Sequence, residues 1–102
     1  MKKPIKFVSQ AEAEYLAALA WYDERSPATA IRFEAEFNRS LEEIRENPER
    51  WAGYLGCRRF LLHHFPFAIV YEESPTLIQI LAVAHAIGSR AIGRVVRESI
   101  TP

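Results

Sequence analysis

The segment that starts at Ser26 constrains the fold most strongly. Ser26-Pro27 is typical of a helix start, with serine as the N-cap and proline at the first helical position, where its missing amide is not needed. Asn47-Pro48 ends the helical pattern. Between these signals, apolar residues recur at helical spacing at Ala30, Phe33, Phe37, Leu41 and Ile44. The sequence therefore predicts an amphipathic helix over residues 27–47 with one face against a core.

A second helix is expected before it. Ser9 and Glu12 fit a capping box, in which the serine hydroxyl accepts from a helix amide and the glutamate carboxylate accepts from the cap amide. Alanine-rich sequence follows, with Tyr15, Leu19 and Tyr22 at helical spacing. We expect a helix over residues 10–24. Because only a short connection separates the two helices, they are predicted to form an αα-hairpin.

Strands are expected on both sides of this hairpin. Residues 4–8 form a short N-terminal strand, and the region 57–85 contains three more, over 57–64, 67–73 and 77–85. The arginine-bearing residues 88–98 are interpreted as a loop with one short helix. The order β-α-α-β-β-β predicts a two-layer α+β domain, in which the N-terminal strand and the helical hairpin pack on an antiparallel sheet. The second face of that sheet would then be free for a site or a partner.

Length, net charge and cysteine content limit the classes of function that this chain can have. A chain of 102 residues forms one domain, residues 1–102, and its 13 basic and 13 acidic residues give no net charge. A protein that relies on many phosphate contacts is usually more basic. Cys57 is the single cysteine, which excludes an internal disulfide and fits a reducing cytoplasm. The sequence has no apolar stretch long enough to cross a membrane and no apolar core of a secretory signal.

The stretch RRFLLHHFPFAIVY, which begins at Arg58, holds most of the candidate polar residues. Alternation places Arg58 and Arg59 on opposite faces of a strand. Either both arginines make surface ion pairs, or one of them lines an anion-accepting groove on the open face. His63 and His64 flank a turn and point apart, so they are interpreted as solvated histidines and no metal is expected.

Three further candidate sites have two interpretations each. His85 ends the last strand, where it acts as a general base or phosphate contact, or caps the sheet by a hydrogen bond to a carbonyl. The two arginines beside Cys57 favour a thiolate, although a lone cysteine at a strand start is typical of a core. The tyrosines and tryptophans mostly fit core or interface packing, but Trp21 and Tyr22, near a helix end, also fit an anchor for a partner protein.

Six motifs, in order, resemble one family. They are A-E-Y-L-A-A-L-A-W-Y at 13–22, F-x-x-x-F at 33–37, I-R-E-N-P at 44–48, G-C-R-R-F-L-L at 56–62, F-P-F-A-I-V-Y at 65–71 and I-L-A-V-A-H at 80–85. Together they are similar to the RelE/ParE toxin superfamily, and most of all to its ParE-like, plasmid-stabilisation branch. The family fold, a strand, a helical hairpin and a three-stranded antiparallel segment, agrees with the predicted order.

The resemblance implies the toxin of a type II toxin–antitoxin system, silenced in a hetero-oligomer by a cognate ParD-like antitoxin whose C-terminal segment folds on binding. RelE-like members cleave mRNA in the ribosomal A site, whereas ParE-like members poison DNA gyrase by binding. Residues 57–85 contain no lysine, and neither tyrosine nor histidine follows His85. These differences favour the ParE branch, and therefore a cytoplasmic binding protein with no catalytic residues, cofactor or membrane partner.

The tail departs from the family pattern. Many members run from the strand-ending histidine through an arginine pair into P-x-Y-W, but this chain has Ile87 at an arginine position and no aromatic residue after it. Two alternatives stay open, a ribosome-dependent endoribonuclease using Arg59, His85 and Arg90, and a non-toxic remnant that binds only its antitoxin. The expected target-facing residues are Arg58, Arg59, Tyr71, His85, Arg90 and Arg94. The expected antitoxin-binding residues are Tyr15, Trp21 and Tyr22.

Overall fold

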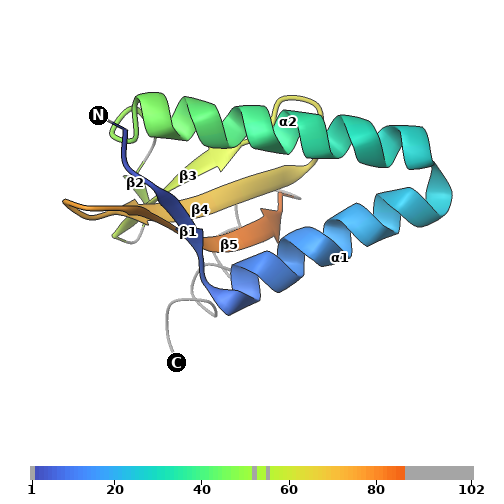
Figure 1. Cartoon of the computed structure of the whole chain (residues 1–102), viewed down its shortest axis with the longest axis horizontal. Coiled ribbons are helices and arrows are strands. Elements are labelled where there is room, and N and C mark those ends of the chain that lie inside the picture. Colours follow the sequence, from blue (N-terminus) through green and yellow to red (C-terminus); the bar gives the residue numbers. More distant parts are fainter. Residues whose placement is uncertain (1, 52, 55, 87–102) are drawn as a thin grey trace.

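Two helices pack beside one five-stranded sheet (Figure 1). The structure is a computed structural model that describes residues 2–51, 53, 54 and 56–86. Its elements are β1 (Ile5–Phe7), α1 (Ser9–Arg25), α2 (Pro27–Glu46), β2 (Gly53–Tyr54), β3 (Cys57–Leu61), β4 (Phe67–Glu73) and β5 (Ile78–His85). The predicted α+β class and element order are confirmed, and β2 is an addition. The tail predicted over 88–98 lies outside the described residues.

A single residue, Ser26, joins the two helices. Its amide donates to the Tyr22 carbonyl at 2.7 Å, and its hydroxyl oxygen accepts from the Thr29 amide at 3.2 Å. Ser26 therefore ends α1 and caps α2, with Pro27 in the first turn as predicted. In Figure 1 the helices meet at this turn and diverge toward β1.

The predicted capping box at Ser9 is wrong. Helix α1 begins at Ser9 itself, and its N-cap is Val8, which makes no side-chain cap hydrogen bond. The Val8 amide donates to the Ile80 carbonyl at 3.0 Å, and the Val8 carbonyl accepts from the Glu12 amide at 3.1 Å. Strand β1 thus runs directly into α1, and the backbone of one residue serves both elements.

The sheet has the strand order β1-β5-β4-β3-β2. Strand β1 pairs parallel with β5, and the other neighbours are antiparallel. Strand β3 ends at Leu61 rather than at the predicted residue 64, because the chain turns and the Leu62 amide donates to the Phe67 carbonyl at 3.0 Å. Gly56, with φ of 84°, makes the turn between β2 and β3, a conformation that favours glycine.

A β-bulge in β5 changes which residues face the helices. Val70 pairs with Ala82 but Tyr71 pairs with Ile80, so Leu81 has no partner in β4. Ile80 belongs to the core under the helices, whereas Leu81 and Ala82 both lie against the other face of the sheet. After the bulge, the odd-numbered residues of β5 face the helices instead of the even-numbered ones, so Val83 lies on the helix side.

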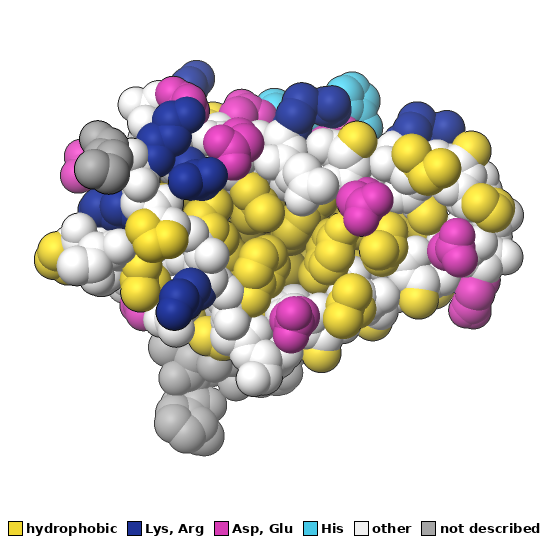
Figure 2. Space-filling model, viewed as in Figure 1, with side chains coloured by type: hydrophobic (Ala, Val, Ile, Leu, Met, Phe, Trp, Pro, Cys, Tyr) yellow, Lys and Arg dark blue, Asp and Glu magenta, His cyan; other side chains and the backbone are white. Residues whose placement is uncertain are grey.

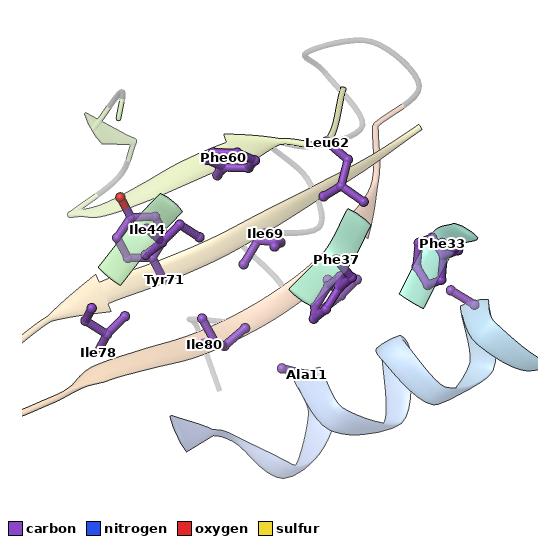
Figure 3. Close-up of a cluster of buried hydrophobic side chains, with 12 residues drawn as sticks. Ala11, Phe33, Phe37, Ile44, Phe60, Leu62, Ile69, Tyr71, Ile78 and Ile80 are labelled. Carbon is purple, nitrogen blue, oxygen red and sulfur yellow. The ribbon is translucent and has the colours of Figure 1, made fainter. Parts of the chain in front are cut away.

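The main core lies between the helices and the sheet (Figure 3). Four members of the predicted helical stripe are buried, and Leu41 is half-buried. Across from them, the sheet contributes Phe60, Ile69, Tyr71, Ile78 and Ile80, and Leu62 follows directly after β3. The stripe prediction for α2 is confirmed.

The opposite face of the sheet carries a second buried cluster. Cys57, Ala68, Val70 and Ala82 are each 6% exposed or less. The prediction that this face lies free is therefore wrong at these four positions. Their side chains are small, and Cys57 is the one thiol of the chain.

Tyr71→Phe tests a polar contact made by a buried core side chain. The Tyr71 hydroxyl donates to the Pro48 carbonyl at 2.6 Å, and the change leaves that oxygen without its partner. We expect the free energy of unfolding to fall by about 1 kcal/mol in urea titrations. Tyr22→Phe is the control, because no hydrogen bond to its hydroxyl is recorded among the described residues. Equal stability of the Tyr71→Phe variant and the wild type would contradict this role.

Candidate protein-binding surfaces

The structure separates the two neighbouring arginines, as alternation predicts. Arg58 lies on the helix side, opposite Tyr71, and its guanidinium donates to the Trp51 carbonyl at 2.9 Å. Arg59 pairs with Val70, a residue of the second cluster, and lies on the face away from the helices. Both arginines are partly buried. One face of the sheet therefore cannot present both of them to a single target.

Tyr71 was expected to face a target, but its side chain is buried in the core. It is 0% exposed in the core, below α2. Burial raises the pKa of its hydroxyl to about 12, with Arg58 opposing the change and Glu73 adding to it. Ile69 and Tyr71 share one face of β4, because alternation is regular between them. Tyr71 thus stabilises the fold, and contact with a target would require the core to open.

His85, expected to contact the target, lines the same groove as Trp21 and Tyr22, which were expected to contact the antitoxin. Because the bulge at Leu81 reverses the alternation, the His85 ring lies 5.0 Å from the Phe67 ring, edge to face. With Glu14, Trp21, Tyr22 and Val83, these residues line a groove of about 500 Å³, here called the His85 groove. Trp21 is 52% exposed at its rim, and Arg25 lies 3.8 Å over the Trp21 ring.

Glu14 fixes one wall of the His85 groove. Its carboxylate accepts from the Val83 amide at 2.8 Å and from the Gln10 side-chain amide at 3.3 Å. A carboxylate of α1 thereby satisfies a backbone donor of β5. The groove offers an aromatic wall with one histidine ring, which suits a large side chain of a protein partner.

Tyr15 is a core residue more than a surface residue. Its ring lies 4.4 Å from Phe37 and 5.9 Å from Phe33. Burial, and then the charge of Glu34, raise the pKa of its hydroxyl. Of the three residues expected to bind an antitoxin, Trp21 is the one with a largely exposed side chain.

An apolar groove runs between the two helices. Hydrophobic side chains gather there in Figure 2, where the helices diverge. Near the Ser26 turn a hollow of about 360 Å³, here called the hairpin groove, is lined by Leu16, Leu19, Ala20, Ala30 and Ile31, with Asp23 and Glu34 at its rim. Leu16 is 54% and Ile31 is 68% exposed. Exposed apolar side chains in one groove are typical of a protein-binding surface.

One buried charge, Glu36, is not among the site residues predicted from the sequence. Glu36 lies in α2 at 3% exposure, and its two carboxylate oxygens contact His64. One oxygen accepts from the His64 amide at 2.8 Å, and the other lies 2.7 Å from the ring Nδ1. Neighbouring His63 reaches toward Glu43 at 3.7 Å. The signal that could have indicated this contact is the helical position of Glu36, three residues after Phe33 and therefore on the apolar face, which Glu34 does not share.

A reactive thiolate and a metal site both find little support in the described part of the chain. Burial, and then the charge of Glu72, raise the pKa of the Cys57 thiol, which argues against a thiolate and agrees with the alternative interpretation of Cys57 as a core residue. The described residues contain no group of three or more side chains able to hold a metal ion. Among them, no helix is long and apolar enough to cross a membrane.

Glu36→Gln tests the contact with His64. Burial alone would raise the pKa of Glu36, but the hydrogen bonds from His64 and the His63 amide outweigh it and leave the pKa below 4.5. The stabilisation is therefore present above pH 4.5 and is lost as the pH falls through the lowered pKa. We expect the variant to lose roughly 1–2 kcal/mol at neutral pH.

Urea unfolding of the wild type and the variant at neutral pH and at about pH 3 measures this contribution. The difference between the two proteins should shrink in acid, while Glu34→Gln, an exposed change in the same helix, leaves stability nearly unchanged at both pH values. A difference that does not depend on pH would contradict the ionic contact.

Comparisons with known proteins agree with this architecture. The family model described as the ParE toxin of the type II toxin–antitoxin system parDE matches residues 5–87. A solved structure from the chromosomal ParDE system of P. aeruginosa superposes with a TM-score of 0.69 at 21% identity, over 80% of this chain and 94% of that chain. A search of curated protein sequences finds no match. Since the family model spans both helices and the described sheet, the chain belongs to the ParE toxin family of type II toxin–antitoxin systems.

Proposed function

We propose that this chain inhibits DNA gyrase by binding it in the cytoplasm, and that a cognate ParD-like antitoxin neutralises it. The observation that carries the proposal is the family match over residues 5–87, which includes every described helix and strand. The toxin acts as a binding module without a cofactor. Where the gene pair is carried on a plasmid, this activity would stabilise the plasmid's inheritance.

The arrangement of the sheet supports binding over mRNA cleavage. A catalytic centre made of Arg59, His85 and Arg90 needs the first two side chains on one surface. Arg59 lies on the face away from the helices, whereas the ring of His85 contacts Phe67 beside α1. General acid–base catalysis requires the groups to lie within hydrogen-bond reach of one substrate. The arginine and the histidine do not share a site of this kind.

The hairpin groove is the proposed docking site for the antitoxin. Leu16 and Ile31 project from different helices and leave apolar surface exposed next to the Ser26 turn. An amphipathic helix that lays its apolar face into such a groove is a common mode of peptide recognition. Trp21, exposed at the rim of the His85 groove on another face of α1, is the proposed aromatic anchor for a second part of the antitoxin.

A gyrase cleavage assay tests the proposed target. The purified chain should trap gyrase on supercoiled plasmid and release linear DNA after denaturation of the enzyme. Arg90→Ala should reduce this linear product by about tenfold, the loss expected for one charge-assisted contact. Arg50→Ala is the matched control, because Arg50 lies over the Trp51 ring in another part of the chain.

Two results would overturn the target assignment. Transcripts cut at codon boundaries, without linear plasmid, would identify the ribosome-dependent endoribonuclease. Neither product, at confirmed expression of the folded chain, would identify a remnant that binds only its antitoxin.

Charge introduced into the hairpin groove tests the antitoxin site. Leu16→Glu combined with Ile31→Glu should weaken binding of the antitoxin from the neighbouring gene by at least about a hundredfold, because two apolar contacts are replaced by desolvated charges. Leu61→Glu is the control, since Leu61 is 51% exposed on β3 and outside this groove. Surface plasmon resonance with immobilised antitoxin gives the affinities. Unchanged binding of the double variant would place the antitoxin elsewhere.

A further inference from the structure

A second polar groove lies on the other side of α2, against the turn between β3 and β4. Its volume is about 750 Å³, and we call it the arginine groove. Arg32, Glu36 and Arg39 line it from α2, while His64, Phe65 and Pro66 line it from the turn. In Figure 2, basic and histidine side chains gather along the same edge of α2.

The helix repeat explains why the two arginines share this groove. Arg32 lies four residues before Glu36 and Arg39 lies three residues after it, so all three side chains occupy one face of α2. Arg32 and Arg39 are exposed, whereas Glu36 is buried. The carboxylate therefore forms part of the floor and the guanidinium groups form the rim.

The Glu36 carboxylate, on the floor of the groove, already has a partner in His64 of the β3–β4 turn. Both of its oxygens contact His64, at 2.7 Å and 2.8 Å. Within the described residues, no ion pair includes Arg32 or Arg39. Arg32 donates to the Thr29 hydroxyl at 3.1 Å, a neutral acceptor. Two cationic groups thus line one groove without an anionic partner.

The contact with Glu36 also orients the histidine. Since Nδ1 of His64 faces the carboxylate, Nε2 is the ring nitrogen left for another partner, and the ring is largely exposed, at 78% for the side chain. A guanidinium presents a planar fork of donors that matches a carboxylate. Between the arginines, Ala35, Phe65 and Pro66 add apolar surface. The groove therefore combines anion donors with an apolar contact area.

We propose that the arginine groove binds an acidic segment of a partner protein, with aspartate or glutamate side chains on Arg32 and Arg39 and an apolar side chain against Phe65 and Pro66. Charge complementarity favours this occupant over nucleic acid. Two arginines neutralise few phosphates, and the chain carries no net charge, whereas a short acidic segment needs only these two contacts. The inference does not rest on gyrase inhibition or on the hairpin groove.

Fluorescence polarisation with a defined probe tests this site. The probe is a labelled peptide, acetylated and amidated at its ends, in which aspartate and glutamate alternate with leucine. The control peptide has asparagine and glutamine in place of the acidic residues. We expect the acidic peptide to bind the full chain, and Arg32→Gln combined with Arg39→Gln to weaken that binding by roughly tenfold. The matched control combines Arg25→Gln with Arg50→Gln, which removes the same charge from arginines that lie over tryptophan rings.

The outcomes separate the groove from general charge effects. Selective loss in the Arg32/Arg39 variant, with its thermal unfolding unchanged, supports the site. Equal binding of the uncharged peptide, equal loss in the Arg25/Arg50 control, or absence of binding to the wild type would overturn it. Displacement of the peptide by single-stranded oligothymidylate at equal concentration would also overturn it, because nucleic acid would then be the occupant.

Discussion

Phe33 holds the helical hairpin to the sheet, and the candidate surfaces depend on its contacts. Its ring lies 5.1 Å from Tyr22 and 5.9 Å from Tyr15 of α1, 5.2 Å from Phe65 of the β3–β4 turn and 5.6 Å from Phe67 of β4. A buried phenylalanine in such a cluster typically contributes about 3–5 kcal/mol relative to alanine. Tyr22 lines both the His85 groove and the arginine groove, with Phe67 in the first and Phe65 in the second. The cluster that stabilises the fold therefore also sets the walls of both grooves.

Local chemistry explains why the helices could be predicted and part of the sheet could not. Ser26 and the apolar stripe of α2 act within one helix, so their spacing is sufficient to identify it. The bulge at Leu81 arises between two strands and has no comparable local signal. Strict alternation from Ile80 would place His85 on the face away from the helices, but the bulge turns it toward Trp21. That one unpaired residue changes which predicted site residues lie together.

Tyr71 and Glu36 show two different limits of sequence analysis. Alternation with Ile69 was enough to place Tyr71 in the core, so its surface assignment followed from residue type rather than from pattern. Glu36 is different, because a charged residue on a buried helix face is intelligible only with its partner. The partner, His64, is 28 residues away and reaches Glu36 only after β3 has turned back toward α2. The sequence contains the anomaly, whereas its explanation requires the fold.

Helix α2 divides the molecule into surfaces of different character. Ile31 faces the hairpin groove with apolar neighbours, while Arg32, the next residue, lines the arginine groove. A net charge of zero argues against a polyanion that would cover the whole protein, but it describes neither groove. Residues such as Ile31 and Arg32 are exposed and carry few constraints from core packing. A chain can therefore keep the family fold at 21% identity to a solved structure, while exposed positions of this kind, on both sides of one helix, can differ without disturbing the core.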